Sequence, residues 1–157
     1  MTWLRTMVFL MIAGFASSGD ANELIGAEPW EIIHIAREFG AADVTRDALK
    51  EPMIVGVMDD VSYSMVFHGC YLGRDCSVIL FKTRLKRDDW TKSPPPLEFY
   101  RAWNRQKLFG RAYRDDDGAA VLEHPVNMTG GVAKETLRDM FKRWRDISRE
   151  FSNYLGN

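Results

Sequence analysis

Residues that commonly bind metals are scarce in this sequence. Its 157 residues include two cysteines and three histidines, which leaves little material for a metal cluster. The motifs of common enzymes are missing too: there is no Gly-x-Ser-x-Gly elbow, no Walker loop and no dinucleotide-binding Gly-x-Gly-x-x-Gly. We therefore expect no metal site, no cofactor and no catalytic residue, and we predict that the protein is not an enzyme.

An excess of charge of either sign is also missing. The chain has 21 basic and 22 acidic residues, for a net charge of -1. Such a balance excludes a strong general attraction to nucleic acid or to an anionic membrane surface, so we expect no nucleic-acid partner. Hydrophobic residues make up 46% and charged residues 27%, values that fit one globular domain and rule out a disordered chain.

The first 21 residues resemble a secretory signal peptide. Arg5 supplies a positive charge, and the uncharged, mostly apolar residues 6–16 follow it. This run is short for a membrane-spanning helix, which needs about 20 residues. Gly19 and Ala21 fit a cleavage rule, as do Gly14 and Ala16; the alternative is a buried or anchoring N-terminal helix. Cleavage after Ala21 predicts a periplasmic or secreted protein that keeps no stable membrane span.

The rest of the sequence predicts a domain at residues 27–155 that mixes helices and strands. Apolar residues at helical spacing predict three helices, and alternating apolar residues predict five strands. The helices are expected at residues 29–39, 97–107 and 132–154, and the strands at 53–58, 61–67, 77–85, 111–114 and 119–128. The order α-β-β-β-α-β-β-α indicates an α+β fold with an antiparallel sheet.

Three local features refine this scheme. Trp30 repeats with other apolar residues at helical spacing, so we place it on the apolar face of the first helix. Pro125 has no backbone N–H, which predicts that its strand is an edge strand or is bulged there. Residues 115–118, Asp-Asp-Asp-Gly, predict a hairpin turn. The alternative, a calcium loop, lacks its twelfth-position glutamate, since Val126 stands there.

The two cysteines predict a disulfide. Cys70 ends one predicted strand and Cys76 begins the next, so the hairpin places their side chains roughly opposite each other. An exported protein meets an oxidising compartment, in which a disulfide persists. Closing this short loop contributes about 2 kcal/mol in the chain-entropy model. The alternative is a zinc site with His68, which offers at most three nearby ligands where four are usual.

One run of residues resembles a known family. Residues 103–113, WNRQKLFGRAY, followed by DDDG at 115–118 and by Val126-Asn127, resemble the YbjN-like domain family. The Gly69-Cys70…Cys76 segment and residues 130–132 resemble its exported bacterial members, and the similarity runs from about Ala27 to Tyr154. The family implies a fold like that of type III secretion chaperones, with the order α-β-β-β-α-β-β-α. Its label is that of bacterial sensory-transduction regulators, with no established reaction.

These observations favour a non-enzymatic, chaperone-like or regulatory module that binds an unidentified protein and forms a homodimer. A sheet face or a helix groove is the expected contact surface. The candidate contact residues are Trp103, Phe109, Arg111 and Tyr113, because aromatic residues and arginine are favoured at binding hot spots. As the alternative for two of them, Trp103 and Tyr113 fill the core between helix and sheet. Export does not fit the delivery of effectors to a type III apparatus.

The alternative function is a small enzyme or ligand-binding domain of the cell envelope. It requires a concave pocket in which polar groups converge, and the residues available for it are His68, Asp75 and His124. A structure distinguishes the two functions by showing whether such a pocket surrounds a histidine.

Overall fold

The computed structural model describes residues 23–156, so the predicted signal peptide at residues 1–21 lies outside the described residues. These residues form three α-helices, α1 (Pro29–Ala36), α2 (Leu97–Gln106) and α3 (Lys134–Tyr154), and a short 3₁₀ helix, η1 (Asp88–Thr91). The principal strands are β2 (Ala42–Arg46), β3 (Pro52–Met58), β4 (Val61–His68), β5 (Val78–Leu85), β6 (Arg111–Arg114) and β7 (Ala120–Asn127). Two-residue strands β1 (Leu24–Ile25) and β8 (Val132–Ala133) pair with each other.

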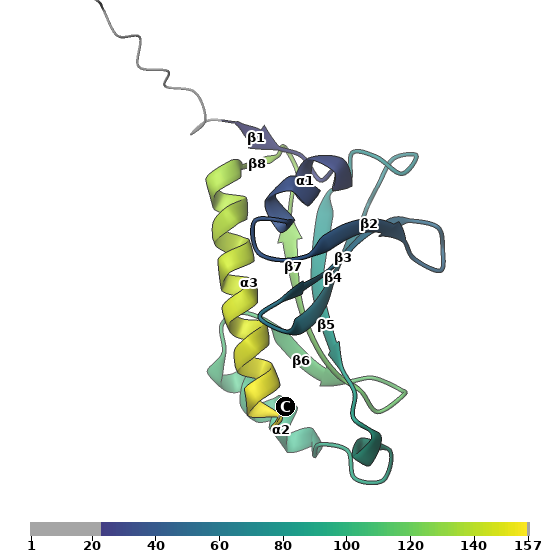
Figure 1. Cartoon of the computed structure of the whole chain (residues 1–157), viewed down its shortest axis with the longest axis vertical. Coiled ribbons are helices and arrows are strands. Elements are labelled where there is room, and N and C mark those ends of the chain that lie inside the picture. The colour runs from purple at the N-terminus through teal and green to yellow at the C-terminus, as the bar shows by residue number, and fades with distance from the viewer. Residues whose placement is uncertain (1–22, 157) are drawn as a thin grey trace, which may run out of the picture.

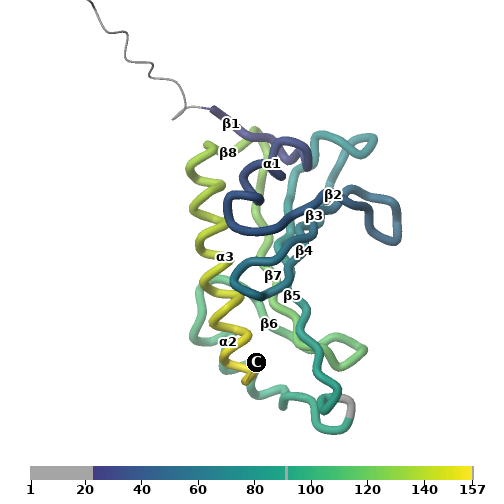
Figure 2. Tube along the Cα trace, viewed as in Figure 1, coloured from purple at the N-terminus to yellow at the C-terminus, as the bar shows by residue number. Residues whose placement is uncertain are grey.

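The six principal strands form one antiparallel sheet in the order β2-β3-β4-β5-β7-β6. Helices α1 and α3 pack on one face of this sheet, and α2 lies beside β6 at its end (Figures 1 and 2). Strands β2 and β6 are the two edges. The predicted α+β class with an antiparallel sheet is therefore confirmed.

The core lies between the sheet and the helices. Alternate residues of the central strands β4 and β5 are buried in it: Tyr63, Met65, Phe67, Ile79 and Phe81. Phe141 and Trp144 of α3 pack against Phe81, with ring centroids 5.2 and 5.4 Å apart. The aromatic stripe at helical spacing in α3 is therefore core. None of the helices in residues 23–156 is both long enough and apolar enough to cross a membrane.

Several elements of the described residues differ from the expectation: β1, β8, η1 and β2 were not predicted, and α1 ends at Ala36 where residue 39 was expected. Strand β2 precedes the three strands that the sequence predicts before α2. Its five residues, ADVTR, include two charged side chains, and such polarity is tolerated because β2 is an edge strand with one side open. Helix α3 begins at Lys134 rather than at residue 132, because the two preceding residues pair with β1.

Pro125 predicts an edge strand or a bulge, but its strand β7 does not lie at the edge of the sheet. Strand β7 lies between β5 and β6, but β6 pairs only with residues 120–123. Pro125 pairs with Leu80 of β5 and lies beyond the end of β6, so its own part of β7 has one neighbouring strand. The missing N–H therefore costs no hydrogen bond on the β6 side.

The open side of β6 is closed by a side chain of α2. The Asn104 side-chain amide donates to the carbonyl oxygen of Ala112 over 2.9 Å and accepts from the N–H of Ala112 over 2.8 Å. These two bonds imitate a neighbouring strand, and they fix α2 against the sheet edge. The same residue pair belongs to the run that resembles the family.

Candidate functional site

A cleft opens at the β2 edge of the sheet. Its walls are the start of α1, the edge strand β2 with Pro52, and the loop of residues 72–75, and its volume is about 1120 Å³. The loop of residues 69–77 and the β2–β3 loop project from the same side of the molecule (Figures 1 and 2). The cleft is lined by Glu28, Pro29, Trp30, Glu31, Val44, Thr45, Arg46, Pro52, Leu72, Gly73, Arg74 and Asp75.

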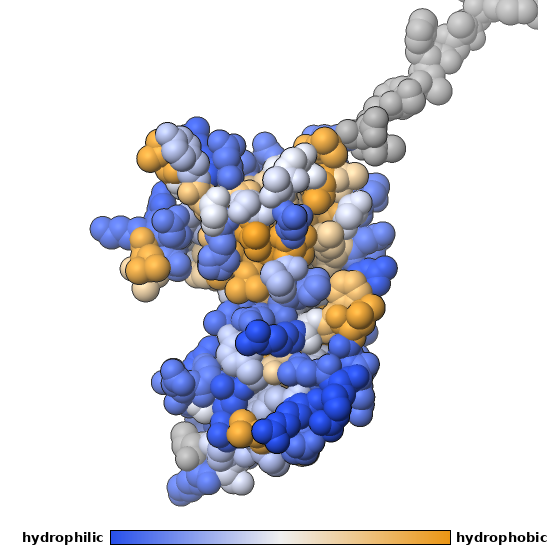
Figure 3. Space-filling model, turned by 180° about the vertical axis from the view of Figure 1, so that it is seen from behind, coloured by the Kyte–Doolittle hydropathy of each residue, from blue (hydrophilic) through white to orange (hydrophobic). Residues whose placement is uncertain are grey.

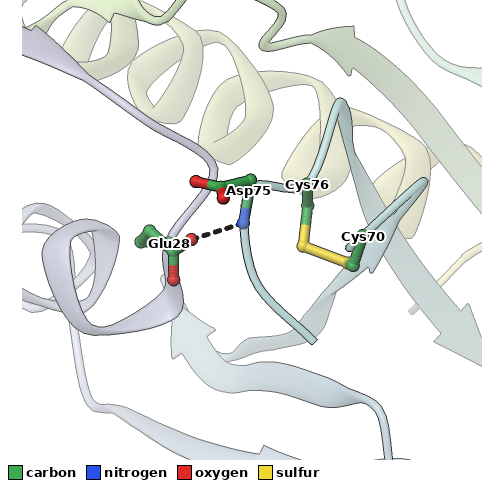
Figure 4. The surroundings of a disulfide bond; sticks show 4 residues. All are labelled: Glu28, Cys70, Asp75 and Cys76. Carbon is green, nitrogen blue, oxygen red and sulfur yellow. Dashed lines mark hydrogen bonds between the residues drawn. A yellow bond between two sulfur atoms is a disulfide. The ribbon is translucent and has the colours of Figure 1, made fainter. Parts of the chain in front are cut away.

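A disulfide holds one wall of this cleft. Cys70 and Cys76 are bonded to each other, and the four lining residues of the loop lie between them. Tyr71 and Arg74 exchange two backbone hydrogen bonds within the loop. The N–H of Asp75 donates to the Glu28 carboxylate over 2.6 Å, which ties the loop to the start of α1 (Figure 4). Because both sulfurs are in a disulfide, they are not the thiolates that the zinc alternative requires.

The loop keeps a shape that ordinary residues adopt at a cost. Leu72 and Asp75 have φ angles of +50° and +48°, in the left-handed region, which costs a non-glycine residue roughly 1–3 kcal/mol. The disulfide and the Glu28 hydrogen bond hold the two ends of this stretch. They therefore keep Leu72, which is 86% exposed, at the rim of the cleft.

Strand β2 offers backbone groups along the cleft. Hydrogen bonds from Val57 N–H to the Ala41 carbonyl and from Asp47 N–H to the Glu51 carbonyl place the odd-numbered residues of β2 in the ladder with β3. The even-numbered residues therefore turn their backbone groups outward, as antiparallel geometry requires. Arg37 Nε donates to the outward carbonyl of Ala42 over 2.9 Å. The backbone of Val44, which lines the cleft, also faces outward.

The remaining walls carry charge of both signs beside apolar groups. Glu31 lies on the α1 side and Arg46 on the β2 side, while Trp30 is 70% exposed at the rim. Trp30 was expected on the apolar face of the first helix, and this expectation is wrong. The buried face of α1 is instead made of Pro29, Ile32, Ile33, Ile35 and Ala36.

This lining suits a polypeptide segment in extended conformation. An outward strand edge supplies a donor and an acceptor, an exposed tryptophan and leucine supply apolar contact, and the charges fix orientation. Among residues 23–156, no group of three or more histidine, cysteine, aspartate or glutamate side chains is placed to hold a metal ion.

Trp103 is not at the surface. Its side chain is 1% exposed, its ring lies 5.0 Å from that of Phe151, and its indole N–H donates to the Gly110 carbonyl over 3.0 Å. The indole has no face left for a partner protein. Trp103 therefore fills the core, which was the alternative to its role as a contact residue.

The other three candidate contact residues lie near β6, at the sheet edge opposite the cleft. Arg111 is exposed and lies over the ring of Tyr113 at 5.6 Å. The Tyr113 hydroxyl donates to Glu123, and burial together with this carboxylate raises the pKa of Tyr113 to about 12. Phe109 lies 4.9 Å from the ring of His124. The structure therefore brings Arg111 and Tyr113 together, places Phe109 against His124 on the side of α3, and separates all three residues from the cleft.

The residues required by the enzyme alternative are dispersed. His68 is exposed at the end of β4, Asp75 lines the cleft, and His124 is half-buried against Phe109. Burial lowers the pKa of His124.

Residues 115–118 form the predicted hairpin turn, in which Asp115 Oδ1 accepts from the N–H groups of Asp117 and Ala119.

The cleft is hard to predict from the sequence. Its walls come from three separate segments of the sequence, residues 28–31, 44–52 and 72–75, and β2 has no strand pattern to place it beside α1. The residue that could have indicated a surface site here is Trp30. Four aliphatic residues already form the buried face of this eight-residue helix, so the large side chain of Trp30 at its second position is left for the surface.

The fold and the cleft together define an α+β domain with an open surface site at a strand edge. The chain belongs to the YbjN family, whose model, described as "Putative bacterial sensory transduction regulator", matches residues 31–157. The description names a regulator and no reaction. No curated protein and no solved structure matches the chain.

Proposed function

We propose that this chain is an exported, non-enzymatic regulatory module that binds an extended segment of a partner protein in the cleft beside β2. The observation that carries the proposal is the cleft itself, where the outward edge of β2 lies beside exposed Trp30 and Leu72. The family description, a sensory-transduction regulator, supports a binding role. Strand addition with side-chain contacts is a general way to bind extended segments, and it makes the module chaperone-like.

Two observations support the exported location. Residues 1–21 have the charge and apolar pattern of a signal peptide. The disulfide between Cys70 and Cys76 persists in an oxidising compartment such as the periplasm. The disulfide also holds the cleft wall, so location and binding are linked in this proposal.

The test is affinity capture of partners from the periplasm by the wild-type protein and by two variants. Leu72→Glu places a carboxylate at the rim of the cleft, where we expect captured partner to fall about tenfold, since a charge cannot replace the apolar contact. Leu49→Glu is the matched control, because Leu49 is 82% exposed and lies outside the cleft lining. Equal capture by both variants contradicts the proposal.

A further inference from the structure

One face of the sheet carries apolar residues although no helix of the described residues covers it. Met53 pairs with Val66, Val66 with Leu80, and Leu80 with Pro125, so these four residues form a straight row across β3, β4, β5 and β7. They lie on the face opposite the core residues Ile54, Met65 and Ile79, since side chains alternate along a strand. We call this row the apolar stripe.

Neighbouring residues widen the stripe. Val55 and Val57 of β3 are 37% and 41% exposed, and Val78 lies two residues from Leu80 on the same face. Figure 3, which shows the molecule from behind, has hydrophobic residues gathered in the upper half of this side. Met53, Val66 and Leu80 of the stripe are half-buried and Pro125 is exposed. Apolar patches that stay at the surface of soluble proteins mark interaction sites.

The composition of the strands points the same way. Residues 53–58 and 78–81 are apolar almost without interruption, a pattern that is typical of strands covered on both faces. Strands with one face in water alternate apolar and polar residues instead. Helices α1 and α3 supply one cover, so the pattern favours a second cover over the stripe.

We propose that a second copy of this chain covers the apolar stripe, with the two sheets packed face to face around a twofold axis that runs along the stripe. A twofold interface brings the same patch of both copies together. An axis along a straight row lays Val66 on Val66 and Leu80 on Leu80 of the second copy. Two sheets packed in this way lie about 10 Å apart and bury both stripes.

The residues beside the stripe are complementary under this symmetry. Glu123 lies two residues from Pro125 on one side of the axis, and Asn127 lies two residues away on the other side. The twofold rotation therefore brings the Glu123 carboxylate toward the Asn127 amide of the second copy. The oxygen of Asn127 already accepts from Thr129 N–H, which leaves its side-chain NH₂ free to donate. Lys82 meets Val78, over which its alkyl chain packs while its ammonium stays in water.

Charge supports association of identical copies rather than attraction of a strongly charged partner. The row next to the stripe, from β2 to β6, contains Asp43, Lys82, Glu123 and Arg111, two of each sign. The full chain carries a net charge of -1. Two copies therefore meet without the repulsion that a face of one sign would cause. This dimer does not depend on the proposed cleft function, because the cleft lies at the β2 edge and the stripe on the face.

The test uses single substitutions to cysteine in the full protein. A residue on a twofold axis meets its own copy, so Val66→Cys and Leu80→Cys are expected to form disulfide-linked dimers on a non-reducing gel. The native cysteines are already bonded to each other. Ser62→Cys is the matched control, because Ser62 is exposed on the same face but away from the axis, and it is expected to form at least tenfold less linked dimer.

Light scattering on the purified protein supplies the second readout. We expect twice the mass of one chain for the wild type and for Ser62→Lys, and a monomer for Leu80→Lys. Val55→Lys replaces Leu80→Lys if the latter fails to fold, since Val55 is more exposed. The proposal is overturned by a monomeric wild type, by a dimer that Leu80→Lys and Val55→Lys both leave intact, or by crosslinking at position 62 equal to that at positions 66 and 80. If the wild type is a monomer and Leu80→Lys captures less partner than the wild type does, the stripe binds another protein and not a second copy.

Discussion

The side chains of Trp103 and Asn104 both bond to the backbone of the segment that enters β6. Trp103 donates to Gly110, and Asn104 both donates to and accepts from Ala112. Gly110 has a φ of +76°, and a Cβ there would come within 2.9 Å of the Leu122 side chain. Residues of the run at 103–113 therefore build the joint between α2 and the sheet.

The half-buried position of His124 predicts a pH-dependent contribution to stability. It is half-buried between β7 and α3, with Phe109 on one side and the Arg143 guanidinium 5.3 Å from the Phe109 ring. Burial lowers its pKa from 6.5, so the unfolded chain binds a proton more readily than the folded one. The stability from neutral His124 is present above pH 6.5 and falls as the pH drops from there toward the lower folded pKa.

We expect the free energy of unfolding of the wild type to fall more between pH 7 and pH 5 than that of His124→Gln, since glutamine does not titrate. Urea denaturation at several pH values measures this difference. His34→Gln serves as a control, because His34 is exposed in α1, and its curve is expected to follow the wild type. Identical slopes for the wild type and His124→Gln would contradict the role of His124.

The disulfide loop is the element that joins stability to the cleft. Replacing both cysteines in Cys70→Ser/Cys76→Ser is expected to lower the free energy of unfolding by about 2 kcal/mol, because the unfolded chain regains the entropy of the open loop. Chemical denaturation without reductant measures the loss. Reduced wild type is expected to match the double variant, and reductant is expected to leave the double variant unchanged. A wild type whose stability is indifferent to reductant would contradict this account.

At the level of elements, the sequence predicted what hydrophobic periodicity can carry. The long stripe of α3, the strands β3 to β5 and the turn at residues 115–118 follow from local patterns, and all are present. Strand β2 could not be predicted, because five residues of mixed polarity give no period and only pairing with β3 makes them a strand. The disulfide could be predicted because both cysteines lie on adjacent positions of one hairpin.

The candidate site was harder to predict because it depends on packing between distant segments. Trp103 has the residue type of a binding hot spot, but its position on the inner side of α2 places it in the core. The role of Leu72 could not be predicted, because no local pattern shows whether a leucine in a short loop is exposed. The loop closed by the disulfide leaves it exposed at the rim of the cleft. Side-chain type selects candidates, whereas exposure is decided by the fold.

For the whole molecule, the proposed cleft and the proposed dimer fit together. A twofold axis along the apolar stripe keeps each β2 on the same side of the pair, so two clefts open along one side of the assembly. A partner with two segments within reach would bind both clefts, and its second binding step would occur at a high effective concentration. A homodimer of this kind suits a regulator that responds to a clustered or repeated partner.

The most direct test of the proposed binding function places a photo-crosslinking amino acid at the cleft in living cells. With the photo-crosslinker in place of Leu72, irradiation is expected to yield a discrete adduct between this chain and a second protein. With the photo-crosslinker in place of Leu49, which is equally exposed but outside the cleft, we expect no such adduct. A matching adduct from position 49, or none from position 72, would contradict the claim that this cleft binds a protein segment.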